Sequence, residues 1–136
     1  MMDLFETIEG ATPIPEAERE NLVPTHITTR QELNEWEAAN ILKATRKYLS
    51  KRRRFDFNVE LIKDIHKEMF DETWKWAGMF RLIDLNMGVD WHTIQIQVKN
   101  LVDDLTYWQE HEELDLLSQS IRLHHRLVKI HPFNNG

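Results

Sequence analysis

Cysteine is absent from this chain, and glycine and proline are scarce. Without cysteine the protein forms no disulfide and has no thiolate nucleophile, which fits an intracellular reducing compartment. Only four glycines and four prolines occur in 136 residues, so few tight turns are expected. Leu, Glu, Lys and Ala recur instead in windows of helical period. The composition therefore predicts an all-α fold and disfavours a β-sandwich or a barrel.

Long apolar runs and an excess of positive charge are missing as well. The acidic N-terminus, residues 1–6, has no uninterrupted apolar stretch, so we expect neither a signal peptide nor a membrane anchor. The formal net charge of −6 opposes binding to a nucleic-acid backbone. The one basic cluster, residues 51–54, follows a helical pattern and is interpreted as a solvated helix end. We predict one cytoplasmic domain that contacts neither nucleic acid nor membrane.

The N-terminal residues 1–28 differ from the rest of the chain in their proline content. They contain three of the four prolines and show no sustained periodicity, which predicts an extended N-terminal arm. Thr29 and Glu32 have the spacing of a capping box, so we expect a helix to begin there and to end near Leu49. A second helix is predicted at 58–70, where apolar residues repeat at helical spacing after a good N-cap residue.

The middle of the chain is less regular. A segment with Trp74 and Trp76, interpreted as core anchors, is expected to form a short helix that Gly78 ends. Turn-forming residues such as Gly88 occur within 82–92. A β-hairpin or an exposed loop is predicted there.

The last third of the chain is expected to form two helices. The first carries apolar residues at helical spacing from Ile94 to Leu105. The second covers about residues 114–130, and Pro132 ends it, because proline disfavours a helical conformation in the residue before it. The apolar face of this final helix is predicted to consist of Leu117, Ile121, His124 and Val128, widened by Leu116, Leu123 and Leu127.

Three histidines in and after the final helix raise the alternative of a metal site. His124 and His125 lie about two turns before His131, but their spacing matches no zinc signature. Because His124 falls on the predicted apolar face, both His124 and His125 are interpreted as buried structural histidines.

The chain ends in the motif His-Pro-Phe-Asn-Asn-Gly at residues 131–136. This motif resembles the signature of the Fic family, which reads His-Pro-Phe, any residue, an acidic residue, Gly, Asn, Gly or Lys, and Arg. Two upstream blocks, residues 65–70 and 76–81, are similar to the family's preceding helix and to its Trp-Ala-Gly turn. Residues 33–41 and 86–91 are further similar to the subgroup called mobile mystery protein B.

The resemblance, which covers about residues 29–136, implies an all-α Fic-type domain with a short β-hairpin flap. Members of the family are typically protein adenylyltransferases, which transfer AMP from ATP to a Ser, Thr or Tyr hydroxyl of a target protein. His131 matches the general base of the motif, a role that suits an imidazole with an ordinary pKa of about 6.5. Phe133, Asn135 and Gly136 match the loop that binds the phosphates of the nucleotide.

The resemblance also places a target-docking segment in this chain. The family's flap pairs with the backbone of the target as an added strand. The residues that match it are Asp90, Trp91, His92 and Thr93. Such pairing would direct a target hydroxyl toward His131. Arg81, at the end of the Trp-Ala-Gly block, either supports the flap or caps a turn, and both interpretations stay open.

Two departures separate the chain from the family signature. The acidic position, a ligand for the Mg²⁺ that accompanies ATP, is Asn135 here, and a neutral amide is a poorer ligand for a hard cation. The sequence also ends at Gly136, before the Asn, the Gly or Lys, and the phosphate-holding Arg of the signature. We therefore expect this truncated chain to be inactive and the full-length protein to be the nucleotidyltransferase.

Three function classes follow from these residues. The first is AMP transfer to a protein hydroxyl. The second keeps the fold but makes the protein a catalytically impaired binding module, which Asn135 motivates. The third is a Doc-like toxin phosphotransferase held by an antitoxin. The expected partners are accordingly a hydroxyl-bearing protein target and an antitoxin or another inhibitory partner.

Overall fold

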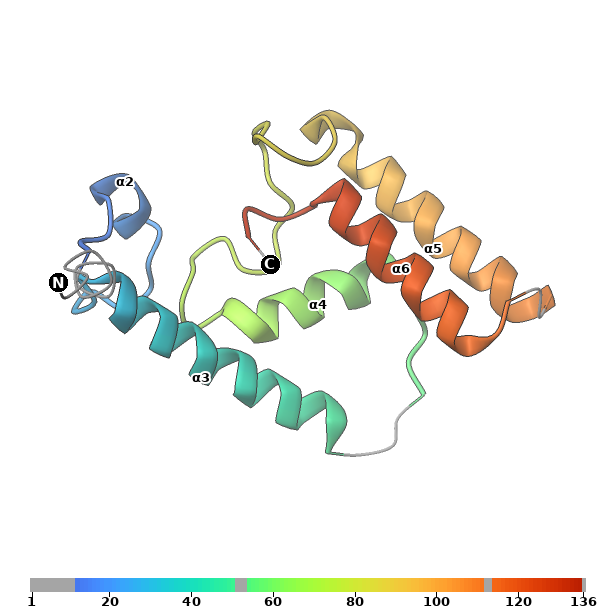
Figure 1. The fold of residues 1–136 in the computed structure, drawn as a ribbon, viewed down its shortest axis with the longest axis horizontal. Coiled ribbons are helices and arrows are strands. Elements are labelled where there is room, and N and C mark those ends of the chain that lie inside the picture. Colours follow the sequence, from blue (N-terminus) through green and yellow to red (C-terminus); the bar gives the residue numbers. More distant parts are fainter. Residues whose placement is uncertain (1–11, 51–53, 112–113, 136) are drawn as a thin grey trace, which may run out of the picture. The chain divides into compact units, whose positions relative to one another are not determined.

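The computed structural model describes residues 12–50, 54–111 and 114–135. Within these ranges every regular element is helical, and the β-type pairings are two isolated bridges, which confirms the predicted all-α class (Figure 1). The chain divides into two compact units. One comprises Met1–Arg53 with Ile65–Gly78, and the other comprises Arg54–Asp64 with Met79–Gly136.

The first unit is built on α3 (Arg30–Leu49), preceded by the short helix α2 (Glu16–Arg19). The N-cap half of the predicted capping box is confirmed, because the Thr29 hydroxyl accepts from the backbone N–H of Glu32, while the Glu32 carboxylate accepts from the Thr29 hydroxyl. The predicted N-terminal arm packs on this unit and contributes to its core, although α2 interrupts its extended path. The buried apolar cluster of this unit consists of Ile14, Leu22, Ile27, Leu33, Phe70 and Trp74.

Asn40 on α3 organises the turns that follow Phe70. Its side chain is 1% exposed, and its amide donates to the Glu68 carbonyl and the Asp71 carboxylate at 3.2 and 3.1 Å. Its Oδ1 accepts from the Glu72 backbone and the Thr73 hydroxyl, both at 3.0 Å. The buried amide is thereby fully hydrogen-bonded, so its burial stabilises one arrangement of this segment.

The predicted short helix at 71–77 is wrong, because this segment is a series of turns. Its backbone groups bond to distant residues: Val23 N–H donates to the Thr73 carbonyl, and Lys75 N–H donates to the Asn21 carbonyl. A helix would need those same groups for its own ladder. The two tryptophans are nevertheless core anchors as predicted, since Trp74 is buried and Trp76 packs on the same cluster.

The second unit contains the first half of α4 (Val59–Phe70), the short 3₁₀ helix η1 (Trp91–Thr93), α5 (Ile94–His111) and α6 (Leu116–Ile130). Asn58 caps α4 by accepting from the Leu61 N–H at 2.8 Å, and Asp115 caps α6 by accepting from the Ser118 N–H at 2.7 Å. Helices α5 and α6 lie side by side and antiparallel (Figure 1). The buried apolar cluster of this unit consists of Ile62, Ile94, Val98, Leu101, Val102, Ile130 and Phe133.

The prediction of which face of α6 packs on the core is wrong. Leu117, Ile121 and Val128 are 70%, 59% and 60% exposed, whereas Leu123 and Leu127 pack against the core. The helix is apolar on two sides, and α5 covers the side that carries Leu123, Leu127 and Ile130. The interpretation of His124 and His125 as buried structural histidines is therefore wrong, because both are exposed.

The segment 82–90 forms a loop, the second of the two predicted alternatives. No strand pairing occurs among its residues in the described structure, so the β-hairpin flap is not observed. Its irregular path is set by bends and by Gly88, which has a φ of 90°. The loop leads directly into η1 and α5.

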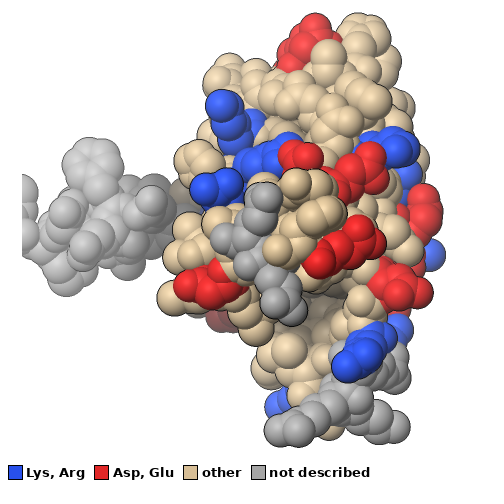
Figure 2. Space-filling model, turned by 90° about the vertical axis from the view of Figure 1, so that its right-hand side faces the viewer, with Lys and Arg blue, Asp and Glu red and all other residues tan. Residues whose placement is uncertain are grey.

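The molecular surface carries both signs of charge. On the face shown in Figure 2, Lys and Arg side chains are interspersed with Asp and Glu. Most of the basic cluster at 51–54 lies outside the described residues. Among the helices that the structure describes, none has the length and apolar character needed to cross a membrane.

Candidate active site

His131 lies directly after the last turn of α6. Its N–H still donates to the Leu127 carbonyl at 2.9 Å, while its own backbone is left-handed, with φ 49° and ψ 67°. Pro132 disfavours a right-handed helical conformation at this position, so the helix ends here. A left-handed conformation costs a non-glycine residue about 1–2 kcal/mol. Among the described non-glycine residues, His131 alone has a positive φ, so neighbouring contacts must hold this turn.

Arg81 supplies most of those contacts. Its side chain is completely buried, and Nε donates to the His131 carbonyl at 2.7 Å. Nη2 donates to the carbonyls of Val89 and Ile130 at 2.5 and 3.3 Å, and Nη1 donates to the Ile83 carbonyl at 2.7 Å. The carbonyl groups at the end of α6 carry the negative end of the helix dipole, which favours a cation there.

The main chain around Arg81 closes the same turn. The Arg81 N–H donates to the Pro132 carbonyl at 2.9 Å, and the Val89 N–H donates to the Ile130 carbonyl at 3.2 Å. Gly88 faces the turn so closely that an added Cβ would lie 2.8 Å from the Cβ of His131 and 2.8 Å from the Ile130 carbonyl oxygen. Only glycine fits this position, because of both the space and the positive φ.

The imidazole of His131 is half-buried, and its surroundings favour the neutral form. Burial lowers its pKa below the ordinary value of 6.5, and the positive charge of Arg81 lowers it further. A neutral imidazole at neutral pH can accept a proton from a hydroxyl group. The geometry therefore provides a candidate general base at the mouth of the loop.

The residues that follow His131 were predicted to bind phosphate. The Phe133 ring is buried in the core against Phe80, with ring centroids 5.4 Å apart, so any contact from Phe133 to a ligand comes from its main chain. Asn135 is half-buried, and Gly136 lies outside the described residues. The predicted phosphate loop thus begins beside the turn at His131 that Arg81 holds.

The predicted flap residues form a compact cap at the start of α5. The Asp90 carboxylate accepts from the His92 N–H at 2.9 Å and lies 2.9 Å from the His92 ring, and the Thr93 hydroxyl donates to the Asp90 carbonyl. The Trp91 N–H donates to Asp84 at 2.9 Å, while its ring packs against the core. These contacts keep 90–93 in a 3₁₀ turn.

The described residues do not build a metal site by themselves. No group of three His, Cys, Asp or Glu side chains comes together among them. At the motif's metal position Asn135 offers one neutral amide oxygen, whereas Mg²⁺ favours carboxylate and phosphate oxygens. A magnesium ion at this site would therefore depend mainly on the phosphates of a nucleotide.

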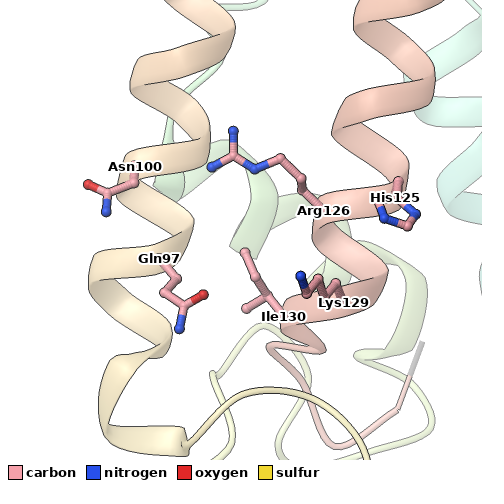
Figure 3. A pocket seen from close by; sticks show the side chains of 6 residues that line it. All are labelled: Gln97, Asn100, His125, Arg126, Lys129 and Ile130. Atoms are coloured by element: carbon pink, nitrogen blue, oxygen red, sulfur yellow. The ribbon is translucent and has the colours of Figure 1, made fainter.

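A pocket of about 320 Å³ lies between α5 and α6 (Figure 3). In Figure 3 Gln97 and Ile130 point into the space between the two helices, and Arg126 reaches toward α5. The guanidinium of Arg126 is already paired with Asp104 at 2.5 Å. Of the residues that line this pocket, only Ile130 is next to the motif in sequence. We therefore do not assign the pocket to the reaction. The residues that line it are Gln97, Asn100, His125, Arg126, Lys129 and Ile130.

Reasoning from the sequence located His131 but did not assign Arg81 and Gly88 to the site. Gly88 was predicted as a turn residue, and the role of Arg81 was left open between flap support and turn capping. The structure shows that Arg81 caps the turn after α6 and also binds the carbonyls of Ile83 and Val89 in the loop. Its position at the end of the Trp-Ala-Gly block was the available signal.

Comparison with known proteins identifies the fold. The family model for the Fic/DOC family matches residues 56–136, and no curated protein sequence matches the chain. The N-terminal Fic domain of Bep8 from Bartonella sp. 1-1C is similar with a TM-score of 0.68 at 20% identity, over 82% of this chain and 61% of that one.

Two further solved structures are similar at the same 20% identity and over 82% of this chain. One is the N-terminal Fic domain of a VirB-translocated effector from Bartonella sp. AR 15-3, with a TM-score of 0.67 and 59% of that chain covered. The other is that of a cell filamentation protein from Bartonella quintana with bound ADP, with a TM-score of 0.65 and 62% covered. The chain thus spans about three fifths of these domains. Because the family model covers more than half of the chain, the protein belongs to the Fic/DOC family.

Proposed function

We propose that the protein is an adenylyltransferase that moves AMP from ATP to a hydroxyl group of a target protein. Its membership of the Fic/DOC family supports a transferase in general. The observation that carries the finer proposal is His131, a half-buried imidazole of lowered pKa at the start of the family motif. The bound ADP in the Bartonella quintana relative is consistent with an adenine-nucleotide donor. The cytoplasm, which supplies ATP, is the proposed compartment.

The proposed reaction needs one proton acceptor and one leaving group. The target hydroxyl oxygen forms a bond to the α-phosphorus of ATP, and the bond from that phosphorus to the bridging oxygen breaks, so pyrophosphate leaves. The hydroxyl proton passes to the neutral imidazole of His131. Backbone N–H groups after Phe133 are proposed to face the phosphate oxygens, and the cap at 90–93 is proposed to position the target.

The test uses the full-length protein with ATP labelled at the α-phosphate and a cell lysate. We expect labelled proteins with the wild type and a loss of labelling of at least about 100-fold in His131→Ala, because a positioned base contributes about 10²–10⁴-fold. The matched control is His124→Ala, an exposed histidine two turns earlier on α6, which should label normally. Undiminished labelling by His131→Ala would overturn the role of the imidazole.

Asn135 motivates a second candidate, a binding module that keeps the fold and has lost the transfer reaction. A neutral amide is a poorer ligand for Mg²⁺ than the carboxylate of the family signature. Calorimetry of the full-length protein with ATP and magnesium separates the two candidates, because absence of nucleotide binding favours the binding module. A parallel reaction with ATP labelled at the γ-phosphate detects phosphate transfer, the toxin-like activity that an antitoxin would restrain.

A further inference from the structure

We propose that Arg81 is a positioning residue for the transfer reaction, and that its guanidinium fixes the direction in which His131 presents its imidazole. The inference rests on the proposed function, because it concerns the same base. Arg81 itself is completely buried and does not reach the solvent-facing mouth of the turn.

The first argument is what the guanidinium binds. Burying a charge costs several kcal/mol unless hydrogen bonds compensate it. The carboxylate of the exposed Asp84 lies 3.9 Å from Nη1, beyond hydrogen-bond distance, so the compensation comes mainly from four backbone carbonyls. Those carbonyls belong to the end of α6 and to the loop before η1. Arg81 thus joins the loop to the end of α6, whose His131 lies 50 residues after Arg81 in sequence.

The second argument is geometrical. The peptide groups on the two sides of a Cα atom determine the direction of its Cα–Cβ bond. At His131 both are held: the Ile130 carbonyl accepts from Arg81 and from the Val89 N–H, and the His131 carbonyl accepts from Arg81 Nε. Gly88 also lies directly beside the Cβ atom of His131. Arg81 therefore fixes the direction of the Cα–Cβ bond from which the imidazole extends.

Lysine could not replace this arrangement. A guanidinium presents its N–H groups in a planar fork and reaches several acceptors at once, whereas an ammonium is a compact point charge. Arg81→Lys therefore keeps the positive charge and loses the geometry, while Arg81→Gln loses both. Comparison of the two variants separates the electrostatic effect of Arg81 on His131 from its positioning effect.

The first measurement needs no turnover. In the 136-residue chain, the His131 imidazole is followed by NMR as the pH is varied. Arg81→Gln should raise the pKa of His131, because a neighbouring cation is removed, whereas Arg81→Lys should change the imidazole chemical shifts with a smaller pKa change. The other ionisable residues of the loop and η1, Asp84, Asp90 and His92, are the same in all variants. Unchanged imidazole shifts in both variants would overturn the proposal.

The second measurement is the transfer rate of the full-length protein. Misplacement of a catalytic group by about 1 Å can cost about 100-fold in rate, so we expect kcat to fall by that order in Arg81→Lys while KM for ATP changes less than about twofold. Gly88→Ala keeps the arginine in the sequence, but its added Cβ would lie 2.8 Å from Arg81 Nη2 and 2.8 Å from the His131 Cβ, so it should displace both and lower kcat in the same way. It also provides the test if an Arg81 variant fails to fold.

A control variant distinguishes positioning from general loss of stability. Arg126→Gln removes another hydrogen-bonded arginine, which lies on α6 five residues before His131 and pairs with Asp104 of α5, and it should leave kcat unchanged. Wild-type kcat in a folded Arg81→Lys protein would overturn the positioning role. If the wild type transfers no label at all, the proposed function fails, and the NMR result still decides whether Arg81 positions His131.

Discussion

His131 combines an unfavourable backbone conformation with an unusual electrostatic environment. The left-handed turn places the residue outside the hydrogen-bond ladder of α6, while burial and the guanidinium of Arg81 disfavour the protonated ring. Strained backbone at a residue of suitable chemistry is common at active sites, where surrounding contacts maintain it. At this residue the contacts come from Arg81, Gly88 and Val89.

The pH dependence of the reaction follows from the lowered pKa. Because the neutral imidazole is the active form, we expect the acidic limb of the kcat/KM profile to lie below pH 6.5. The measurement is a pH–rate profile of the full-length protein. In Arg81→Gln the limb should move to higher pH, and an acidic limb at or above pH 6.5 in the wild type would contradict the assignment of His131 as the base.

The same shift affects stability, with a defined sign. Between the lowered pKa of the folded state and 6.5, the unfolded chain binds more protons at His131 than the folded chain does. The free energy of unfolding therefore rises with pH across this window and falls as the solution is acidified through it. Urea unfolding of the wild type and of His131→Ala at several pH values measures this contribution, which the variant should lack.

At the scale of single elements, α6 shows how an amphipathic pattern leaves orientation undecided. Two rows of apolar residues run along this helix, and the row through Leu123 and Leu127 packs on the core. The row through Leu117, Ile121 and Val128 is exposed. Because Ile130 belongs to the buried row, the orientation of α6 also sets the direction from which the chain enters the His131 turn.

A pair of identical substitutions tests this orientation. Leu127→Ala should lower the free energy of unfolding by about 1–2 kcal/mol, because part of a packed side chain is removed. Leu117→Ala, at a 70% exposed position, should change it by less than about 0.5 kcal/mol. Both changes introduce alanine into the same helix, so helix propensity cancels in the comparison. Equal losses measured by urea unfolding would argue against the exposed row.

At the scale of the whole molecule, each of the two units has its own buried cluster. In the first unit the cluster surrounds Leu33 and Trp74, together with apolar residues from the N-terminal arm. In the second unit the cluster surrounds Val98 and Leu101 and includes Phe133 of the motif. The candidate active site lies entirely within the second unit, because Arg81, the loop, α6 and the motif all belong to it.

Matched substitutions in the two clusters test this division. Leu33→Ala and Leu101→Ala each remove a side chain that is at most 1% exposed, so each should cost about 2–5 kcal/mol. Native-state hydrogen exchange should then accelerate mainly in the helices of the substituted unit. Only Leu101→Ala should disturb the NMR signals of the His131 ring, and an equal disturbance by Leu33→Ala would contradict the division.

The local pattern of residues was sufficient to determine much of this protein. The period of the apolar residues predicted the helices α3 to α6 closely, because helix formation depends on spacing and caps within a few residues. The motif at 131–136 and its upstream blocks determined the family, which the family model then confirmed. His131 could be identified from the sequence alone because the residues of the motif are consecutive.

Only the tertiary structure decided which groups surround His131. Arg81, Gly88 and the Ile130 carbonyl meet there although about 50 residues separate the first from the last. Neither the choice of exposed face on α6 nor the turns that Asn40 stabilises could be derived from local spacing, because each depends on long-range hydrogen bonds or packing. The spacing of residues along the chain predicts local helices. Which side chains are buried, and which backbone groups are capped by distant residues, is decided only when the chain folds.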